Sequence, residues 1–155
     1  MNVLDIMTKS PAVCTPDTRL TDVARMMVEH DCGAIPVVTS QNNPSPVGMI
    51  TDRDIVVRVV AEGRSPAEHI VSDAMSHSVA TVHGSDSLQT ALQVMEENQV
   101  RRLPVVDEQG HVIGILAQAD VALNASSDQT ADVLREVSED EDALLSAPMG
   151  GTYSG

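Results

Sequence analysis

The chain has 155 residues, of which 42% are hydrophobic, so it can form one domain or two small units that share a core. Its 23 acidic residues outnumber nine basic ones and give a formal net charge of −14, which repels a phosphate polymer and an anionic membrane. A single aromatic residue, Tyr153, excludes the stacking platform that single-strand nucleic-acid binders use.

Targeting signals are not apparent in the sequence. No apolar run reaches about 18 residues, the length of a membrane span, and residues 1–9 lack the basic start and apolar centre of a signal peptide. We therefore expect a cytoplasmic protein with no membrane or nucleic-acid partner. Cys14 and Cys32 are too few for a disulfide framework. We interpret them as buried free thiols, with a redox pair or a metal role as the alternative.

The chain contains the same pattern twice. The opening Asp5-Ile6-Met7-Thr8 returns 68 residues later as Asp73-Ala74-Met75-Ser76, and Pro36-Val37-Val38 returns at the same offset as Pro104-Val105-Val106. After a turn that is two residues shorter in the second copy, the offset becomes 66. Turns vary freely in length, so the change does not disturb the repeat. A register this strict indicates two copies of one supersecondary unit.

In chain order, each copy begins with a strand and a helix. Short strands are expected at Ala12–Thr15 and Ala80–Val82. The helix that follows each strand shows apolar residues at intervals of three and four, which mark one buried face. These positions are Leu20, Val23, Ala24 and Met27 in the first copy and Leu88, Ala91, Leu92 and Met95 in the second.

A hairpin and a final helix complete each copy. The valine-rich end of the first copy favours a strand locally, but the polar start before it and Gly63 after it favour a helix. The predicted hairpin strands and final helix are Ile35–Val38, Val47–Ile50 and Asp52–Ala61 in the first copy, and Leu103–Val106, Val112–Leu116 and Gln118–Asn124 in the second.

These elements predict an α+β chain in which two pseudo-symmetric units, each β-α-β-β-α, pack together. The first unit is expected at residues 2–63, a linker at 64–70 and the second unit at 71–124. Residues 125–155 form a tail with the acidic run Glu139-Asp140-Glu141-Asp142, and we expect this tail to be largely disordered, with one or two helical turns at 132–137.

The stretch Gly48–Asp54 ends a predicted strand and begins a helix. Thr51 and Asp54 have the spacing of a capping box, in which each side chain accepts from a free backbone N–H at the helix start. The same hydroxyl and carboxylate could hold the two hydroxyls of a ribose, with a phosphate facing the positive end of the helix. Both interpretations remain open on this stretch alone.

The Asp-x-Met-Thr/Ser openings, the Pro-Val-Val strands and the Gly-x-x-Thr-x-x-Asp ending together resemble a tandem pair of CBS domains, also called a Bateman module. The resemblance covers about residues 2 to 124. It is similar to small stand-alone bacterial CBS-pair proteins of the hypoxic-response type, notably over Thr51–Val56 and Val100–Val105. The resemblance implies a sensor of adenine nucleotides and a dimer that forms a flat disc of four domains.

The resemblance also implies that Thr51 and Asp54 grip the ribose hydroxyls. In the second copy Asp120 keeps the acid, but Ala117 stands where the threonine is expected. A final helix can therefore start without this hydroxyl, which favours a ligand role for Thr51 and leaves the second site incomplete.

Three arginines are candidates for a ligand phosphate. The resemblance implies that Arg101 or Arg102 faces it, and since neighbouring strand residues point in opposite directions, at most one does so. An ordinary ion pair is the alternative for these two, and a solvated side chain is the alternative for Arg53. Ile35 and Pro36 are expected either as an apolar wall against an adenine ring or as core residues.

Sequence motifs of the common enzyme classes are absent. The chain has no Gly-x-Ser-x-Gly elbow, no Gly-x-x-x-x-Gly-Lys phosphate loop and no His-Glu-x-x-His. His77 and His83 could meet a metal together with Asp73, but scattered surface histidines explain them as well. We predict no catalytic residue and no metal site.

The sequence therefore predicts a non-catalytic regulatory module, most simply a homodimer, with AMP, ADP or ATP in a cleft between its units. AMP or ATP is the expected ligand, and no covalent cofactor is expected. One alternative is a ligand-free interaction protein that acts through its dimer surface or acidic tail. The other is a redox- or metal-responsive protein that uses Cys14 and Cys32. The sequence does not indicate the protein target.

Overall fold

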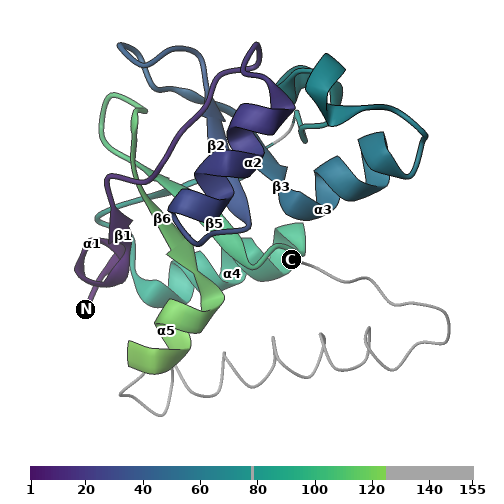
Figure 1. The fold of residues 1–155 in the computed structure, drawn as a ribbon. Helices are drawn as coiled ribbons and strands as arrows, with labels where there is room; N and C mark the ends of the chain where they lie inside the picture. The colour runs from purple at the N-terminus through teal and green to yellow at the C-terminus, as the bar shows by residue number, and fades with distance from the viewer. Residues whose placement is uncertain (78, 125–155) are drawn as a thin grey trace, which may run out of the picture.

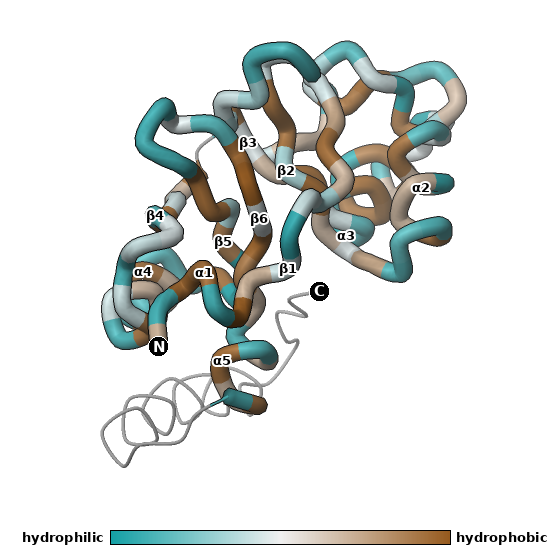
Figure 2. Tube along the Cα trace, turned by 90° about the vertical axis from the view of Figure 1, so that its left-hand side faces the viewer, coloured by the Kyte–Doolittle hydropathy of each residue, from teal (hydrophilic) through white to brown (hydrophobic). Residues whose placement is uncertain are grey.

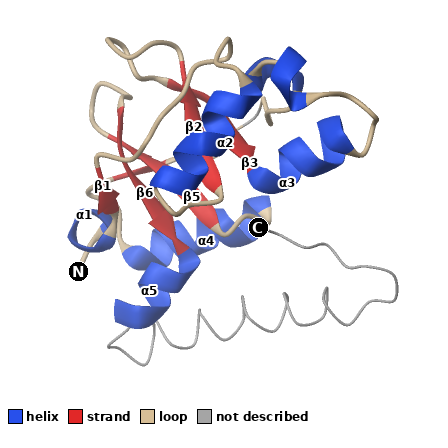
Figure 3. Ribbon diagram, in the orientation of Figure 1, coloured by secondary structure: helices blue, strands red, loops and turns tan. Residues whose placement is uncertain are grey.

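A computed structural model of the chain describes residues 1–77 and 79–124 (Figure 1). This part of the chain contains both helices and strands, and loops connect them (Figure 3). The predicted tail, with its acidic run and Tyr153, lies outside the described residues. None of the helices described combines the length and the apolar character needed to cross a membrane.

The first copy contains the predicted helix and hairpin. The helix at Leu20–Met27 is confirmed, with Leu20, Val23 and Met27 buried, but the prediction was wrong for Ala24, which is exposed. The elements in chain order are helix α1 (Val3–Ile6), strand β1 (Thr8–Lys9), helix α2 (Leu20–Glu29), strands β2 (Ala34–Val38) and β3 (Pro46–Thr51), helix α3 (Asp52–Ile55) and the π-helix η1 (Val56–Val60).

The second copy has its helix and hairpin in the same order after two short 3₁₀ turns, and the strand expected at Ala80–Val82 is observed at Val82–His83. The side chain of Ser87 accepts a hydrogen bond from the backbone N–H of Thr90 at 3.0 Å and starts the long helix of this copy, which ends at Gln99 in the left-handed region. The elements are turns η2 (Pro66–Glu68) and η3 (Val71–Asp73), strand β4 (Val82–His83), helix α4 (Leu88–Asn98), strands β5 (Arg102–Val106) and β6 (Val112–Ala117), and helix α5 (Gln118–Asn124).

The strands form one four-stranded sheet in the order β1-β6-β5-β4 and a separate hairpin of β2 and β3. Each hairpin is antiparallel, and each has an irregularity at the same place in the repeat, between Val37 and Val38 and between Val105 and Val106. The predicted hairpins are therefore confirmed, and their pairing follows the same pattern in both copies.

In the first copy, the predicted first strand was wrong, and the predicted final helix was confirmed only in part. The strand expected at Ala12–Thr15 is reduced to one bridge, in which Cys14 pairs with Val37; Pro11 and Pro16 flank this segment and cannot donate to a ladder. The helix expected at Asp52–Ala61 is α-helical only as far as Ile55 and then widens into η1. Branched valine side chains crowd the turns of an α-helix, and the wider π-helical turns coincide with the valine-rich run Val56–Val60.

The openings of the two copies are exchanged. Thr8 in β1 pairs with Ile115 in β6, within the hairpin of the second copy. Ser76, which opens the second copy, pairs with Met49 in β3 of the first. The Met49 N–H donates to the Ser76 carbonyl at 3.1 Å, and the Ser76 N–H donates to the Met49 carbonyl at 2.9 Å. Each opening thus extends the hairpin of the other copy.

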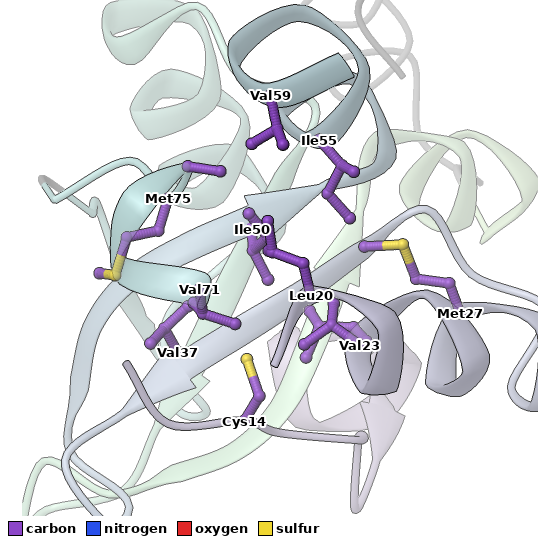
Figure 4. Close-up of a cluster of buried hydrophobic side chains, with 12 residues drawn as sticks. Cys14, Leu20, Val23, Met27, Val37, Ile50, Ile55, Val59, Val71 and Met75 are labelled. Atoms are coloured by element: carbon purple, nitrogen blue, oxygen red, sulfur yellow. The ribbon is translucent and has the colours of Figure 1, made fainter. Parts of the chain in front are cut away.

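The first hydrophobic core follows this exchange. Val71, Ala74 and Met75 from the second copy's opening are buried with side chains of the first copy (Figure 4). Ile50 lies in the middle of the view, between the α2 side chain Leu20 and the side chains of α3 and η1. The opening of the second copy, which follows the linker, therefore completes the core of the first copy.

The second core has the reciprocal composition. Val3 in α1 is fully buried with α4 and hairpin side chains such as Leu92 and Leu103. Figure 2 shows the result: α1 and β1 lie with α4, α5, β5 and β6 on one side, while α2, α3, β2 and β3 lie on the other. Val38 and Val106, which are equivalent in the repeat, share a third small cluster that joins the two hairpins.

Two glycines allow the exchanged openings to approach. A Cβ on Gly48 would overlap the carbonyl oxygen of Ser76 and the Met75 side chain. A Cβ on Gly114, the equivalent residue, would overlap the Met7 sulfur and lie 2.9 Å from the carbonyl oxygen of Thr8. The glycine of the Gly-x-x-Thr-x-x-Asp ending is therefore needed for close contact between the copies.

The Gly48→Ala variant should lower the free energy of unfolding by about 2–3 kcal/mol, because the added methyl must displace a backbone carbonyl in a packed region. Gly63→Ala is the matched control: Gly63 has a φ of 78° and open space around it, so its substitution costs only the left-handed conformation, about 1–2 kcal/mol. Urea unfolding midpoints measure both. Equal losses for the two variants would contradict the close-approach explanation.

Candidate functional site

Thr51 and Asp54 form a reciprocal cap where β3 ends and α3 begins. Thr51 has an extended backbone, and its Oγ1 accepts a hydrogen bond from the Asp54 N–H at 3.0 Å. The Oδ2 atom of Asp54 accepts from the Thr51 N–H at 3.0 Å. The capping box predicted from the sequence is therefore confirmed.

This cap leaves part of each side chain able to bind a ligand. The Thr51 hydroxyl accepts one hydrogen bond and keeps its own proton to donate, and the Asp54 carboxylate uses Oδ2 and keeps Oδ1. The side chain of Asp54 is 17% exposed, so it is largely shielded but reachable. Capping and ribose binding are compatible, and the cap fixes both side chains before any ligand arrives.

Arg58 is a residue near this pair that the sequence-based prediction missed. Its Nε lies 3.9 Å from Oδ1 of Asp54, and its Nη1 donates to the carbonyls of Ala74 at 3.2 Å and Met75 at 3.0 Å. A sequence signal was available: Arg58 follows Asp54 by four residues, the spacing at which side chains meet on a helix.

Arg53 lies in the first turn of α3, between the two acids. It is half-buried, and its N–H donates to Oδ1 of Asp52 at 2.7 Å. The Asp52 N–H donates in turn to the carbonyl of Gly33 at 3.0 Å. The residues before β2 are thus tied to the start of α3, next to the capped pair.

Arg101 and Arg102 stand in the second copy where Gly33 and Ala34 stand in the first. Arg102 pairs with Ala117 across the second hairpin, and the Arg101 carbonyl accepts from the Gln118 N–H at 2.8 Å. Backbone pairing therefore brings both arginines to the start of α5. Whether either one reaches a ligand held by Thr51 stays a prediction.

The second copy does not repeat the cap. α5 begins at Gln118 with Asp120 in its first turn, and Ala117 before it has no hydroxyl to accept a hydrogen bond. Asp120 is half-buried, and its carbonyl accepts from the Asn124 side chain at 2.7 Å. The two halves of the pseudo-symmetric chain therefore offer different chemistry at equivalent positions.

Ile35 and Pro36 are both buried in β2. Ile35 is fully buried in the first core and pairs with Ile50 across the hairpin. The Pro36 carbonyl accepts from the Cys14 N–H at 3.1 Å. Ile35 is therefore a core residue, which was one of the two interpretations from the sequence. Contact of Ile35 and Pro36 with an adenine ring stays a prediction.

The two cysteines are free thiols that contact the first core. Cys14 is buried, and burial raises the pKa of its thiol to about 12. Its sulfur lies 3.8 Å from the Pro36 carbonyl, to which the thiol donates. Cys32 is half-buried. The prediction of free thiols is confirmed for both, and full burial is confirmed for Cys14 alone.

The next candidate is the possible metal site at Asp73, His77 and His83. Oδ2 of Asp73 accepts from the Ile70 N–H at 3.0 Å and so caps the turn η3. Within residues 1–77 and 79–124, no three side chains of His, Cys, Asp or Glu are grouped so that they could hold a metal ion.

Comparison with known sequences identifies the class. The family model described as "CBS domain" matches residues 3–61 and again residues 71–126. The chain belongs to the CBS-domain family and carries two such domains in tandem, which confirms the resemblance stated from its motifs.

Its relatives include small proteins of the same organisation. The CBS domain-containing protein YhcV of Bacillus subtilis is 39% identical over 130 residues, which cover 84% of this chain and 89% of YhcV. Hypoxic response protein 1 of Mycobacterium tuberculosis is 38% identical over 118 residues, which cover 76% of this chain and 80% of that protein.

Solved structures confirm the α+β fold of a CBS pair. The crystal structure of hypoxic response protein I with two coordinated zinc ions has a TM-score of 0.73 at 35% identity, covering 81% of this chain and all of that one (100%). The structure of CBSX2 from Arabidopsis thaliana in complex with AMP has a TM-score of 0.66 at 30% identity, covering 79% of this chain and 94% of that one.

Thiol labelling at pH 8 should find one fast and one slow cysteine in the folded chain. Cys14 is buried, and burial raises its pKa to about 12, so its thiol stays protonated at pH 8, whereas Cys32 is partly accessible. Cys32→Ser should remove the fast phase, and Cys14→Ser should leave it. Equal labelling rates would contradict the burial of Cys14.

The raised pKa of Cys14 also predicts how stability depends on pH. In the unfolded chain the thiol has its ordinary pKa of 9.0, whereas in the folded chain the pKa is about 12. The protonated thiol therefore contributes its full stabilisation below pH 9, and this contribution falls as the pH rises toward 12. Urea unfolding of the unmodified chain and of Cys14→Ser at pH 8 and pH 10 measures the difference. The same loss of stability in both chains over this range would contradict the assignment to Cys14.

Proposed function

We propose that this chain is a non-catalytic regulatory module that binds an adenine nucleotide, AMP, ADP or ATP, between its two CBS domains. The observation that carries the proposal is the capped pair Thr51 and Asp54, which presents a donor hydroxyl and a carboxylate oxygen in fixed positions. A similar CBS pair, CBSX2, has been crystallised in complex with AMP, which supports the same class of ligand here.

The chemistry of a nucleotide matches these groups. One ribose hydroxyl would exchange hydrogen bonds with the Thr51 hydroxyl, and the other would donate to Oδ1 of Asp54. The phosphate would lie against Arg53 and against Arg101 or Arg102 from the other domain, since guanidinium groups bind phosphate oxygens strongly. With a net charge of −14, the chain needs such local cations to hold an anionic ligand.

We assign unequal roles to the two halves. The first-copy pair would be the main site, with Ile35 and Pro36 closest to the adenine ring. Asp120 would form a second, weaker site, because Ala117 supplies no hydroxyl beside it. Binding would change the population of two conformations of the module, which requires that the nucleotide binds one of them more tightly.

We also propose that the module works as a homodimer. Three valines in η1 have exposed fractions that are large for apolar side chains: 56% for Val56, 46% for Val57 and 51% for Val60. Clustered apolar surface of this kind commonly marks a contact with another chain. A second copy of the module would cover it.

Calorimetric titration with AMP and ATP should detect micromolar binding to the unmodified chain and none to the double variant Thr51→Ala/Asp54→Ala. The double variant also loses the cap, which costs about 1–2 kcal/mol of stability, so its folded fraction must be checked by circular dichroism. Thr51→Ser keeps both the cap and the hydroxyl, and it should bind nearly as well as the unmodified chain.

Two outcomes would contradict this proposal in different ways. Unchanged affinity in a folded double variant would remove Thr51 and Asp54 from the site. No heat from the unmodified dimer with either nucleotide would remove the nucleotide function and favour a ligand-free interaction protein.

A further inference from the structure

Arg58 occupies a position that links the candidate ligand site to the other CBS domain. It lies in η1, four residues after Asp54, and its guanidinium reaches across to the opening of the second copy. There Nη1 donates to two consecutive carbonyls, those of Ala74 and Met75. Both of these residues are almost fully buried, with exposed fractions of 1% and 3%. Buried carbonyls need donors, so these bonds help to hold the segment in place.

The segment that Arg58 holds leads back to the candidate site. Directly after Met75, Ser76 exchanges two backbone hydrogen bonds with Met49 in β3. Two residues later β3 ends at Thr51, whose cap is completed by Asp54, and Asp54 lies beside Arg58. Asp54, Arg58, the Met75–Ser76 segment and β3 thus form a closed circuit of contacts. A change at one member must be accommodated by the others.

The contact between Asp54 and Arg58 is well placed to respond to a ligand. Oδ2 of Asp54 is committed to the cap, so a ribose hydroxyl would bind Oδ1, the atom that lies 3.9 Å from Nε of Arg58. This separation is too long for a hydrogen bond, so it leaves room for either partner to move. Binding at Oδ1 therefore changes the electrostatic environment of Arg58 directly.

Within the described residues, the second copy lacks this link. The residue equivalent to Arg58 is Asn124, whose side chain donates to the carbonyl of Asp120 within its own helix. The carbonyls equivalent to those of Ala74 and Met75 belong to Ile6 and Met7. The first copy thus has both the Thr51–Asp54 cap and the arginine that bonds to the other copy, and the second copy has neither at the equivalent positions.

We propose that Arg58 is the positioning residue of the first-copy site, and that it transmits occupancy of this site to the opening of the second CBS domain. The proposal rests on the proposed nucleotide function. Because coupling between two sites is reciprocal, loosening the opening segment must also weaken ligand binding at Asp54.

Arg58→Gln in the full-length chain tests this link by hydrogen exchange and calorimetry. Without ligand, the amides of Ser76 and Met49 should exchange about tenfold faster, the factor expected when charge-assisted hydrogen bonds are lost. AMP should slow exchange at Ser76 in the unmodified chain and leave it unchanged in Arg58→Gln. The Kd for AMP should rise about fivefold or more in the variant. The Asp54 amide should still respond to AMP, because the cap is intact.

Arg25→Gln is the matched control, since Arg25 also pairs with a neighbouring aspartate, Asp22, at 3.5 Å, but on the solvent-exposed face of α2. It should change none of these quantities. If the unmodified chain binds AMP, and Arg58→Gln binds it equally well with the same protection at Ser76, the link is wrong while the nucleotide function stands. If the unmodified chain does not bind AMP, the nucleotide function and the transmission both fail. The ligand-free exchange rates then decide separately whether Arg58 holds the segment.

Discussion

Paired backbone hydrogen bonds between Met49 and Ser76, together with their counterpart between β1 and β6, hold each opening segment on the hairpin of the other copy. Gly48 and Gly114 make this contact possible, because any side chain would collide with the incoming strand. The same segments carry buried residues such as Val3 and Val71 into the opposite core. Neither core is complete without residues from both copies, so a ligand held by one domain can affect the other.

Departures from symmetry give this chain its candidate function. The repeat supplies two equivalent backbones, but the first copy combines a hydroxyl, a carboxylate and an arginine that reaches into the other domain. At the equivalent positions the second copy has Ala117, Asp120 and Asn124. A CBS pair built in this way would respond mainly through one site, and the other half would serve as the structural partner that receives the signal.

Much of the fold could be predicted because the repeat constrains it twice. The spacing of apolar residues placed α2 and α4, and the hairpins followed from valine-rich segments around a turn. The exchange of openings could not be predicted, since identical motifs in both copies are equally compatible with pairing within a copy. The single bridge at Cys14 and the π-helix η1 depend on proline and valine context that a periodicity does not contain. At the candidate site the sequence identified Thr51 and Asp54, but it treated capping and ligand binding as competing roles. It missed Arg58, whose carbonyl partners lie 16 and 17 residues further along the chain.

The central claim is that Thr51 and Asp54 recognise the two hydroxyls of a ribose, and the most direct measurement varies the ligand and leaves the protein unchanged. Calorimetric titration of the full chain with AMP and with 2′,3′-dideoxy-AMP compares ligands that differ only in those hydroxyls. We predict that AMP binds at least about tenfold more tightly, because the dideoxy ligand would leave the Thr51 hydroxyl and the Asp54 carboxylate without their partners. Equal affinities for the two ligands would contradict the account.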